Sequence, residues 1–419
     1  MKMKIRNESN PYVVIVGLDT VQGLQAARIF SENDIPVIGV GKDRRHFSFR
    51  TNSCRHKITA DTHSPSLIDS LIEIGQKLTN RAVLIPCEDV IVLLISRNRE
   101  RLKAWFRIVL PEEDVVETLM NKDRFYQYAQ RIGAPIPQTY FLTNRTTAEV
   151  AAEKLNYPGI VKPSFKSREW IQLTALKAFK VYNPDQLLAV YDQYSQISDS
   201  LIVQDYIEGP STNLFSCIVY FDNTSNPAVT FTARKLRQWP PETGQTCLGE
   251  ALENETITRN TIRLFRELAF YGLGYLEVKK DDRNGKYYII EPNIGRPTGP
   301  SALAEACQVD RLYRLYCDAV GKPFQGNLRP AAKGLKWVYL RQDFQSFLHH
   351  RRSSRLSVRE WLASLKGPKA YAVFSWKDPR PFFSDILRVI RIAMTPSERQ
   401  KRNFRNMPLT QTEEVKEIE

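Results

Sequence analysis

Three stretches follow one another directly in the chain: Tyr275-Leu-Glu-Val-Lys-Lys280, Asp281-Asp-Arg-Asn-Gly285 and Lys286-Tyr-Tyr-Ile-Ile-Glu-Pro-Asn293. The first and third stretches are rich in aromatic and branched residues, which favour β-strands. The middle stretch has the Asp, Asn and Gly composition of a tight turn. The three stretches together predict a β-hairpin with acidic side chains on both strands.

The acidic side chains of this hairpin have the spacing of a metal site. Residues i and i+2 of a strand face the same side, so Glu291 and Asn293 can share a ligand, and Glu277 can face them across the hairpin. Carboxylate and amide oxygens suit Mg²⁺, which also binds through substrate phosphates. The alternative interpretation is a pair of solvent-facing acids on an edge hairpin. It fits less well with the apolar neighbours Leu276 and Ile290.

The N-terminal third alternates strand and helix patterns. Three short apolar runs are typical of buried parallel strands: Tyr12–Gly17, Ile35–Val40 and Ala82–Ile85. Gln22–Asn33 and Val90–Ser96 have helical apolar spacing. This alternation predicts a doubly wound parallel sheet. The first turn, however, has neither the dinucleotide fingerprint nor the P-loop motif, which excludes a nicotinamide enzyme and a P-loop ATPase.

Two lysines lie at structural breaks of the next region. Lys122 opens a helix expected over Asn121–Ile132, and Lys162 lies in the apolar run Gly159–Pro163. A lysine on an apolar strand is costly unless its ammonium meets an anion such as phosphate. Alternatively, either lysine extends to solvent along its apolar stem. Leu201–Pro210 is an apolar strand with a polar Gly-Pro end, whose backbone groups can bind an adenine edge.

At these residues, from about Tyr12 to about Asp318, the chain resembles the ATP-grasp superfamily. The Glu-x-Asn motif with its upstream acid is the specific part of the resemblance. Within the superfamily, the phrases Arg234–Pro241 and Asn293–Gly299 resemble predicted ATP-dependent carboxylate–amine ligases. The resemblance implies a C–N bond-forming, ADP-forming ligase with ATP and Mg²⁺, or Mn²⁺, as cofactors.

The resemblance also implies roles for individual residues. The metal ligands would be Glu277, Glu291 and Asn293, and the phosphate-contacting lysines would be Lys122 and Lys162. Arg296 would be the basic residue, just past the metal motif, that faces the transferred phosphate. The adenine hinge would be Gln204, Asp205, Tyr206 and Ile207, with Ser211 at the ribose position. Lys235 and Arg237 alternate on an expected strand, where they would bind the acceptor carboxylate or acyl phosphate; an exposed basic edge strand is the alternative.

Two positions depart from the family pattern. The phosphate loop Ser164–Trp170 contains no glycine, so Lys166 and Arg168, or Lys177, would replace backbone amides. Ser211 stands where an acid commonly holds the ribose, so ribose recognition would move to Glu208 or Asn213. Neither departure affects the metal motif.

The expected fold class is α/β with three parts. They are a pre-ATP-grasp α/β domain over 1–115, a two-lobed α+β ATP-grasp domain over 116–325 with a hinge near 204–210, and a basic extension over 326–419. The extension would be mainly helical, over Trp337–Leu348, Ser357–Leu365 and Pro381–Met394, and would end in a disordered acidic tail.

The positive charge is concentrated near the C-terminus. The formal net charge is +14, and residues 333–405 contain 17 Lys or Arg against 5 Asp or Glu. Pro381–Met394 has an apolar and a basic side, which fits either an interfacial membrane helix or a helix packed on the protein body, the more common case. Nucleic acid is not expected, because no recognised binding module is present.

The cellular location follows from cysteine usage and from the apolar runs. The six cysteines are scattered and form no Cys-x-x-Cys pair, which indicates reduced thiols. No apolar run approaches the roughly 20 residues needed to span a bilayer, and Val13–Val16 is too short for a signal peptide. We therefore expect a cytoplasmic protein, with peripheral membrane contact through 381–394 as an option.

The expected function is an ATP- and Mg²⁺-dependent ligase. It would join a small carboxylate, such as an amino acid, to an amine through an acyl phosphate, and would release ADP and phosphate. Envelope or polysaccharide metabolism is the expected setting. The alternative is a non-catalytic ATP-binding protein that docks on an anionic membrane through its basic C-terminal region.

Overall fold

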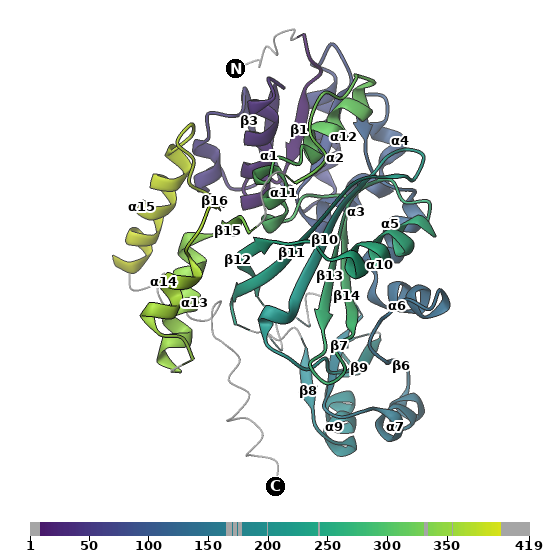
Figure 1. Cartoon of the computed structure of the whole chain (residues 1–419). Helices are drawn as coiled ribbons and strands as arrows, with labels where there is room; N and C mark the ends of the chain where they lie inside the picture. The colour runs from purple at the N-terminus through teal and green to yellow at the C-terminus, as the bar shows by residue number, and fades with distance from the viewer. Residues whose placement is uncertain are drawn as a thin grey trace. The chain divides into compact units, whose positions relative to one another are not determined.

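Short apolar strands and helices with polar caps account for the architecture of the chain (Figure 1). The computed structural model describes residues 9–164, 170, 174, 178–198, 200–241, 244–330, 334–353 and 355–394. The described residues within 1–136, 207–237 and 246–385 form one unit, and those within 137–206, 238–245 and 386–419 form another.

The first unit begins with the predicted parallel sheet. Its strand order is β3-β2-β1-β4-β5, and all neighbouring strands are parallel. The strands are β1 (Val13–Val16), β2 (Val37–Gly41), β3 (His56–Thr59), β4 (Ala82–Pro86) and β5 (Phe106–Ile108). The accompanying helices are α1 (Val21–Glu32), η1 (Phe47–Arg50), α2 (Ser66–Gly75), α3 (Asp89–Arg97) and α4 (Arg99–Leu102). The doubly wound sheet expected from the sequence is confirmed.

A larger sheet of seven strands follows in the first unit, in the order β14-β13-β10-β11-β12-β15-β16. Its strands are β10 (Leu214–Phe221), β11 (Pro227–Trp239), β12 (Gln245–Ala251), β13 (Gly272–Lys280), β14 (Tyr287–Ile294), β15 (Lys336–Val338) and β16 (Lys369–Tyr371). The helices around it are α5 (Glu113–Met120), α6 (Lys122–Arg131), η2 (Ser211–Asn213), α10 (Glu255–Arg266), η3 (Gly299–Ser301), α11 (Ala302–Ala306) and α12 (Arg311–Val320).

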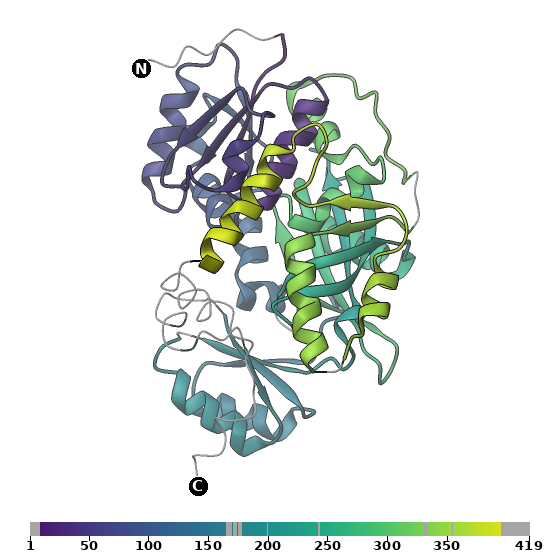
Figure 2. The same cartoon turned by 90° about the vertical axis from the view of Figure 1, so that its left-hand side faces the viewer.

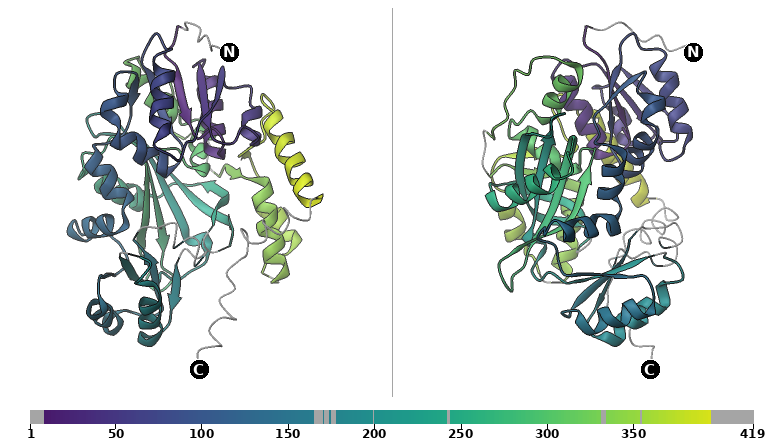
Figure 3. Two further views of the ribbon diagram at one scale, coloured as in Figure 1. Left: turned by 180° about the vertical axis from the view of Figure 1, so that it is seen from behind. Right: turned by 90° about the vertical axis from the view of Figure 1, so that its right-hand side faces the viewer.

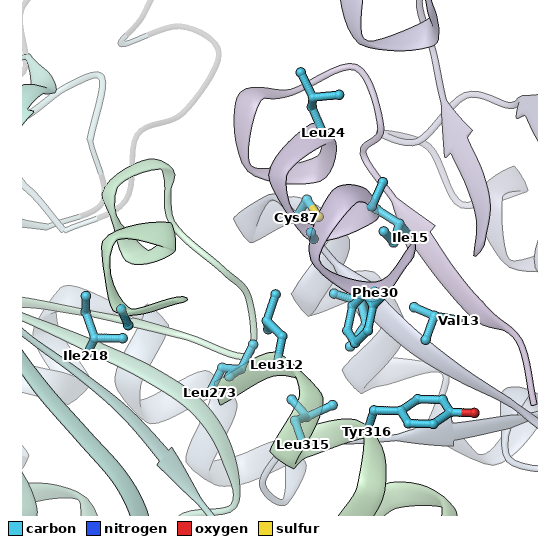
Figure 4. Packing of buried hydrophobic residues seen from close by; sticks show 14 of the residues in the cluster. Val13, Ile15, Leu24, Phe30, Cys87, Ile218, Leu273, Leu312, Leu315 and Tyr316 are labelled. Atoms are coloured by element: carbon cyan, nitrogen blue, oxygen red, sulfur yellow. The ribbon is translucent and has the colours of Figure 1, made fainter. Parts of the chain in front are cut away.

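A shared apolar core joins the two sheets of the first unit. Figure 4 shows Phe30 of α1 close to Tyr316 of α12, with their ring centroids 6.4 Å apart. Leu312 and Leu315, from the same helix α12, belong to the cluster that also contains Ile218 of β10. The β13–β14 hairpin therefore belongs to a sheet that packs, through α12, against the N-terminal sheet.

The C-terminal region contains the three predicted helices, but the first of them begins later than expected. Trp337 was expected in a helix, but it lies in β15, opposite Gly249 of β12, and is 2% exposed. Helix α13 (Leu340–Arg352) begins only afterwards and is followed by α14 (Val358–Ser364) and α15 (Arg380–Met394). Strands β15 and β16 thus extend the large sheet, because their apolar side chains complete its core. The expected acidic tail lies outside the described residues.

The second unit contains a four-stranded sheet in the order β6-β9-β7-β8 (Figure 3). Its strands are β6 (Thr139–Leu142), β7 (Gly159–Pro163), β8 (Phe179–Val181) and β9 (Leu201–Asp205). Val161, Val203 and Leu187 share one apolar cluster, which places α7 (Arg145–Lys154) and α9 (Pro184–Tyr194) on one face of the sheet. The opposite face carries the alternate residues of each strand.

All six cysteines lie in the described residues, where they are free and buried. The prediction that they form no disulfide framework is therefore confirmed. Burial raises the pKa of Cys54 to about 12, so that this thiol stays protonated. No helix in the described part of the chain is both long and apolar enough to cross a bilayer.

Candidate active site

The register of β13 and β14 places Glu277 directly opposite Glu291. Asn293 lies opposite Tyr275, and each of them is two residues away from the acid on its own strand. Ile290 is an extra residue in this ladder, since Glu277 pairs with Glu291 whereas Val278 pairs with Ile289. Bulges of this kind re-aim neighbouring side chains and are common beside functional sites. The two acids and the amide therefore belong to one face of the hairpin, as the sequence predicts.

This oxygen set fits a divalent cation that arrives with a phosphate ligand. The side chain of Glu277 is 21% exposed, and Glu291 is an exposed residue, so both carboxylates are accessible to a ligand. Within the described residues there is no group of three or more His, Cys, Asp or Glu that could hold a metal alone. Mg²⁺ commonly uses one or two carboxylates and takes its other ligands from water and substrate phosphates.

Lys235 of β11 lies beside Glu277, one of the two hairpin acids. Its Nζ lies 3.4 Å from Oε2 of Glu277, and the residue is 7% exposed. Lys235 and Glu277 also line a small pocket together with Ser216, Thr246 and Tyr275. Burial, and secondarily the charge of Glu277, raises the pKa of the Tyr275 phenol, which therefore stays a neutral group. The pocket thus brings a cation and hydroxyl groups together, around a space of only about 10 Å³.

Arg296 connects the metal motif to the N-terminal sheet. Its Nη2 donates to Oδ1 of Asn293 at 2.7 Å, and its Nε donates to Oδ1 of Asp89 at 2.5 Å. Asp89 is the first residue of α3, three positions after Pro86 at the carboxyl end of β4. The guanidinium therefore orients the Asn293 amide, whose oxygen is the predicted metal ligand. The contact of Arg296 with the transferred phosphate stays a prediction.

Sequence reasoning missed the residues next to Asp89. The carboxylate oxygen Oε2 of Glu88 lies 3.1 Å from Nε2 of His63, within hydrogen-bonding distance. A Cβ on Gly17 would stand 3.5 Å from the same carboxylate oxygen, so Glu88 lies over the end of β1. Strands β1 and β4 form the topological switch point of the sheet, where open α/β sheets commonly bind ligands. The signal in the sequence was the acidic pair Glu88 and Asp89, which begins two positions after an apolar strand.

Arg237 lies in a buried ion pair. Its Nε and Nη2 donate to the two carboxylate oxygens of Asp343 in α13, at 2.7 and 3.1 Å, and its Nη1 donates to Oγ of Ser364 at 2.7 Å. The indole of Trp361 also donates to Asp343, at 2.8 Å. These contacts favour a role of the Arg237 side chain in holding α13 and α14 in place over contact with a substrate. The substrate role expected from strand alternation with Lys235 stays a prediction.

Replacing Arg237 by Met, which keeps the apolar length, should therefore lower the free energy of unfolding by about 3 kcal/mol, because the Asp343 carboxylate would stay buried without its partner. KM for the carboxylate substrate should change less than twofold. Denaturant unfolding and steady-state kinetics check the two parts. The Lys235→Met variant is the matched comparison: it should retain stability to within about 1 kcal/mol and raise KM. The reverse pattern would assign Arg237 to the substrate.

The predicted nucleotide residues of the second unit lie around one face of its sheet. Lys162 is paired with Ile202, and Gln204 with Ile160, across β7 and β9. Gln204 is 2% exposed, and its Nε2 donates to Oγ1 of Thr139 at 2.7 Å. The face with these side chains is opposite to the one that packs on α7 and α9.

Two further predicted nucleotide residues of this unit lie at the end of β9. The carboxylate of Asp205 accepts from the side chain of Asn156 at 2.9 Å. The ring of Tyr206 lies under Nζ of Lys180, 3.9 Å from its centroid. Their roles in adenine binding stay predictions.

The remaining predicted nucleotide residues lie at segment ends. Lys122 is the first residue of α6, which Asn121 caps. The carbonyl of Ile207 accepts from Nζ of Lys279 at 2.7 Å, and Ser211 opens η2. The chain passes from one unit to the other between Tyr206 and Ile207, inside the expected hinge segment. Lys177 and the phosphate loop from 165 to 169 lie outside the described residues.

No family model matches the chain, but two curated proteins match parts of it. Over 244 residues it is 21% identical to the D-aspartate ligase of Enterococcus faecium (strain Aus0004), covering 55% of this chain and 58% of that protein. Over 91 residues it is 29% identical to the D-alanine–D-alanine ligase of Ectopseudomonas mendocina (strain ymp), covering 22% and 27%. The chain thus spans less than two thirds of either relative's length.

Solved structures resemble a larger part of the chain. The N5-carboxyaminoimidazole synthetase of Staphylococcus aureus gives a TM-score of 0.61 at 15% identity and covers 78% of this chain and 82% of that one. The biotin carboxylase domain of the Hydrogenobacter thermophilus 2-oxoglutarate carboxylase, solved with MgADP and bicarbonate, gives 0.60 at 16% identity and covers 78% and 73%. The chain has the fold of the ATP-grasp enzymes. In sequence it resembles their carboxylate–amine ligases, as predicted.

Proposed function

We propose that this protein is an ATP- and Mg²⁺-dependent ligase that joins a small carboxylate to an amine. The observation that supports this most is the hairpin register, which pairs Glu277 with Glu291 and aligns Asn293 beside them. A buried lysine, Lys235, and an arginine, Arg296, adjoin this oxygen set. The names of the two curated relatives, an amino-acid ligase in each case, support the same reaction class.

The proposed cofactors follow from the donor set and from the neighbouring structures. Glu277, Glu291 and Asn293 would hold Mg²⁺, or Mn²⁺, and the bound ion would neutralise charge on the phosphate oxygens. One structural neighbour contains MgADP and another contains ADP. Lys122, Lys162 and Lys177 would contact the phosphates, and Gln204–Ile207 with Ser211 would hold the nucleoside. These assignments rest on the resemblance, residue by residue.

The proposed reaction has two steps. A carboxylate oxygen of the substrate attacks the γ-phosphorus of ATP, the bond to the β–γ bridging oxygen breaks, and ADP leaves. The amine nitrogen then attacks the acyl carbon, the acyl–phosphate bond breaks, phosphate leaves, and the nitrogen loses a proton. Lys235 can hold the substrate anion, and Arg296 can steady the transferring phosphoryl group. No side-chain nucleophile is required.

The finer assignments are an amino acid as the carboxylate, an envelope or polysaccharide precursor as the amine, and the cytoplasm as the location. The relatives' names support an amino acid, and the six free cysteines fit a reducing compartment. The second candidate function is ATP binding without turnover. The complete Glu277, Glu291 and Asn293 set favours the enzyme, because mere docking to a membrane would not need it.

The test is product release from Mg²⁺-ATP in the presence of pools of amino acids, hydroxy acids and amino sugars. A carboxylate–amine pair that stimulates ADP and phosphate formation in a one-to-one ratio would support the ligase and identify its substrates. Release of AMP and pyrophosphate would contradict the acyl-phosphate route. ATP binding without turnover on any pool, lipid-linked amines included, would favour the non-catalytic alternative.

A further inference from the structure

Helix α15 exposes its apolar side chains. Phe383, Ile386, Leu387 and Ile390 are 57%, 40%, 65% and 49% exposed. Their spacing of three and four residues places them on one stripe of the helix. An amphipathic helix more commonly packs its apolar face on the protein, which would leave these four side chains buried. We call these four residues the α15 stripe; Figure 2 shows α15 in yellow.

A polar residue attaches the beginning of α15 to α13 of the first unit. Asp385 is 5% exposed, and its Oδ2 accepts from Nε of Arg341 in α13 at 3.0 Å. Phe382 packs against the core of the first unit. The inward side of the helix is thus occupied by a carboxylate and a ring, and its most apolar side is left outward. This inversion leaves apolar surface exposed, which commonly marks an interaction site.

Basic residues border the α15 stripe. Arg380, Arg388 and Arg391 are exposed and follow one another at helical spacing beside the stripe. Two other acids of this basic region point inward, because Asp343 pairs with Arg237 and Asp378 pairs with Arg28. Among the described residues of this region, the exposed basic side chains therefore have fewer exposed acids beside them than the sequence count suggests.

Trp376 adds an exposed aromatic side chain in the segment that leads into α15. It is 87% exposed. Ring contacts connect it to Phe374, with 4.8 Å between centroids, then to Phe382 at 5.1 Å and to Phe383 at 5.7 Å. Exposed tryptophan, an apolar stripe and flanking arginines are the components of helices that lie in a membrane interface.

We propose that the α15 stripe and Trp376 form a docking surface for a bilayer of anionic phospholipids. The apolar side chains enter the boundary between headgroups and acyl chains, and Arg380, Arg388 and Arg391 bind the phosphates of the headgroups. Charge complementarity selects a lipid surface over a neutral apolar partner, because each arginine near an anionic surface strengthens binding. The proposal does not depend on the ligase activity.

The test is sedimentation of the full chain with vesicles of phosphatidylcholine, with or without phosphatidylglycerol. We expect binding only to the anionic vesicles, with a blue shift of tryptophan emission that is lost in Trp376→Phe. Leu387→Glu should weaken binding at least about tenfold, since it removes an apolar contact and adds a repelled charge. Arg388→Glu should weaken binding and reduce its salt dependence.

Matched controls make the result specific. Val150 is 42% exposed on α7 of the second unit, so Val150→Glu should leave vesicle binding unchanged. An unchanged thermal midpoint and circular dichroism show that Leu387→Glu still folds. Absence of binding to anionic vesicles, or equal binding to neutral ones, would overturn the proposal. A dimer in light scattering that Leu387→Glu dissociates would instead assign the stripe to a second copy of this chain.

Discussion

Replacing Glu291 by Gln should lower ATP-dependent ligation by at least about 100-fold. A bound cation supplies several kcal/mol of stabilisation to the transferring phosphoryl group, and each 1.36 kcal/mol corresponds to a factor of ten in rate. Glutamine keeps the size and the strand but removes the charge that holds the ion. Glu277→Gln should have an equal effect, because Glu277 pairs with Glu291 across the hairpin. The measurement is ADP release under saturating substrates.

The controls separate a lost metal site from a lost fold. Glu149→Gln, on an exposed surface of α7, should leave turnover unchanged, since Glu149 only pairs with Arg145 at the surface. The stabilisation of the protein by Mg²⁺-ADP in thermal unfolding should fall in Glu291→Gln, whereas the unliganded midpoint should not. Full turnover in Glu291→Gln would contradict the assignment of the hairpin as the metal site.

The local features of the hairpin explain why the sequence could predict it. Strand propensity, turn composition and the alternation of side chains all act over a few residues, so Glu277, Glu291 and Asn293 were found together. The doubly wound sheet was predictable for the same reason, since each strand and helix has its own apolar pattern. The bulge at Ile290 was not predictable, because it depends on the pairing of two strands and not on one of them.

The interactions that sequence reasoning missed join residues far apart in the chain. Arg237 and Asp343 are 106 positions apart, and Arg296 and Asp89 are 207 apart. Trp337 was assigned to a helix because its neighbours have helical spacing, but pairing with β12 dominates in the structure. The pattern of α15 shows two faces but not which of them the protein covers. Packing against other elements decides all of these features.

Replacing Arg28 by Met should lower the free energy of unfolding by about 3–5 kcal/mol, the cost of leaving one charge of a buried pair without its partner. Arg28 Nε donates to Oδ2 of Asp378 at 3.0 Å, and its other nitrogens donate to the carbonyls of Val373 and Asp378. Burial lowers the pKa of Arg28, and the Asp378 charge opposes this effect. Denaturant unfolding measures the change.

The same network shows why this loss should be large for a single side chain. Asp378 also accepts from the Thr51 hydroxyl at 2.5 Å and from the Asn52 amide at 3.1 Å, so it ties the segment after β16 to the N-terminal sheet region. Arg145→Met, at an exposed pair, should leave the free energy of unfolding almost unchanged. In the double variant Arg28→Met with Asp378→Asn, the loss of stability should be smaller than the sum of the two single losses, because each change removes the same interaction. Additive costs would instead mean that the two side chains stabilise the fold independently and that the ion pair between them contributes nothing of its own.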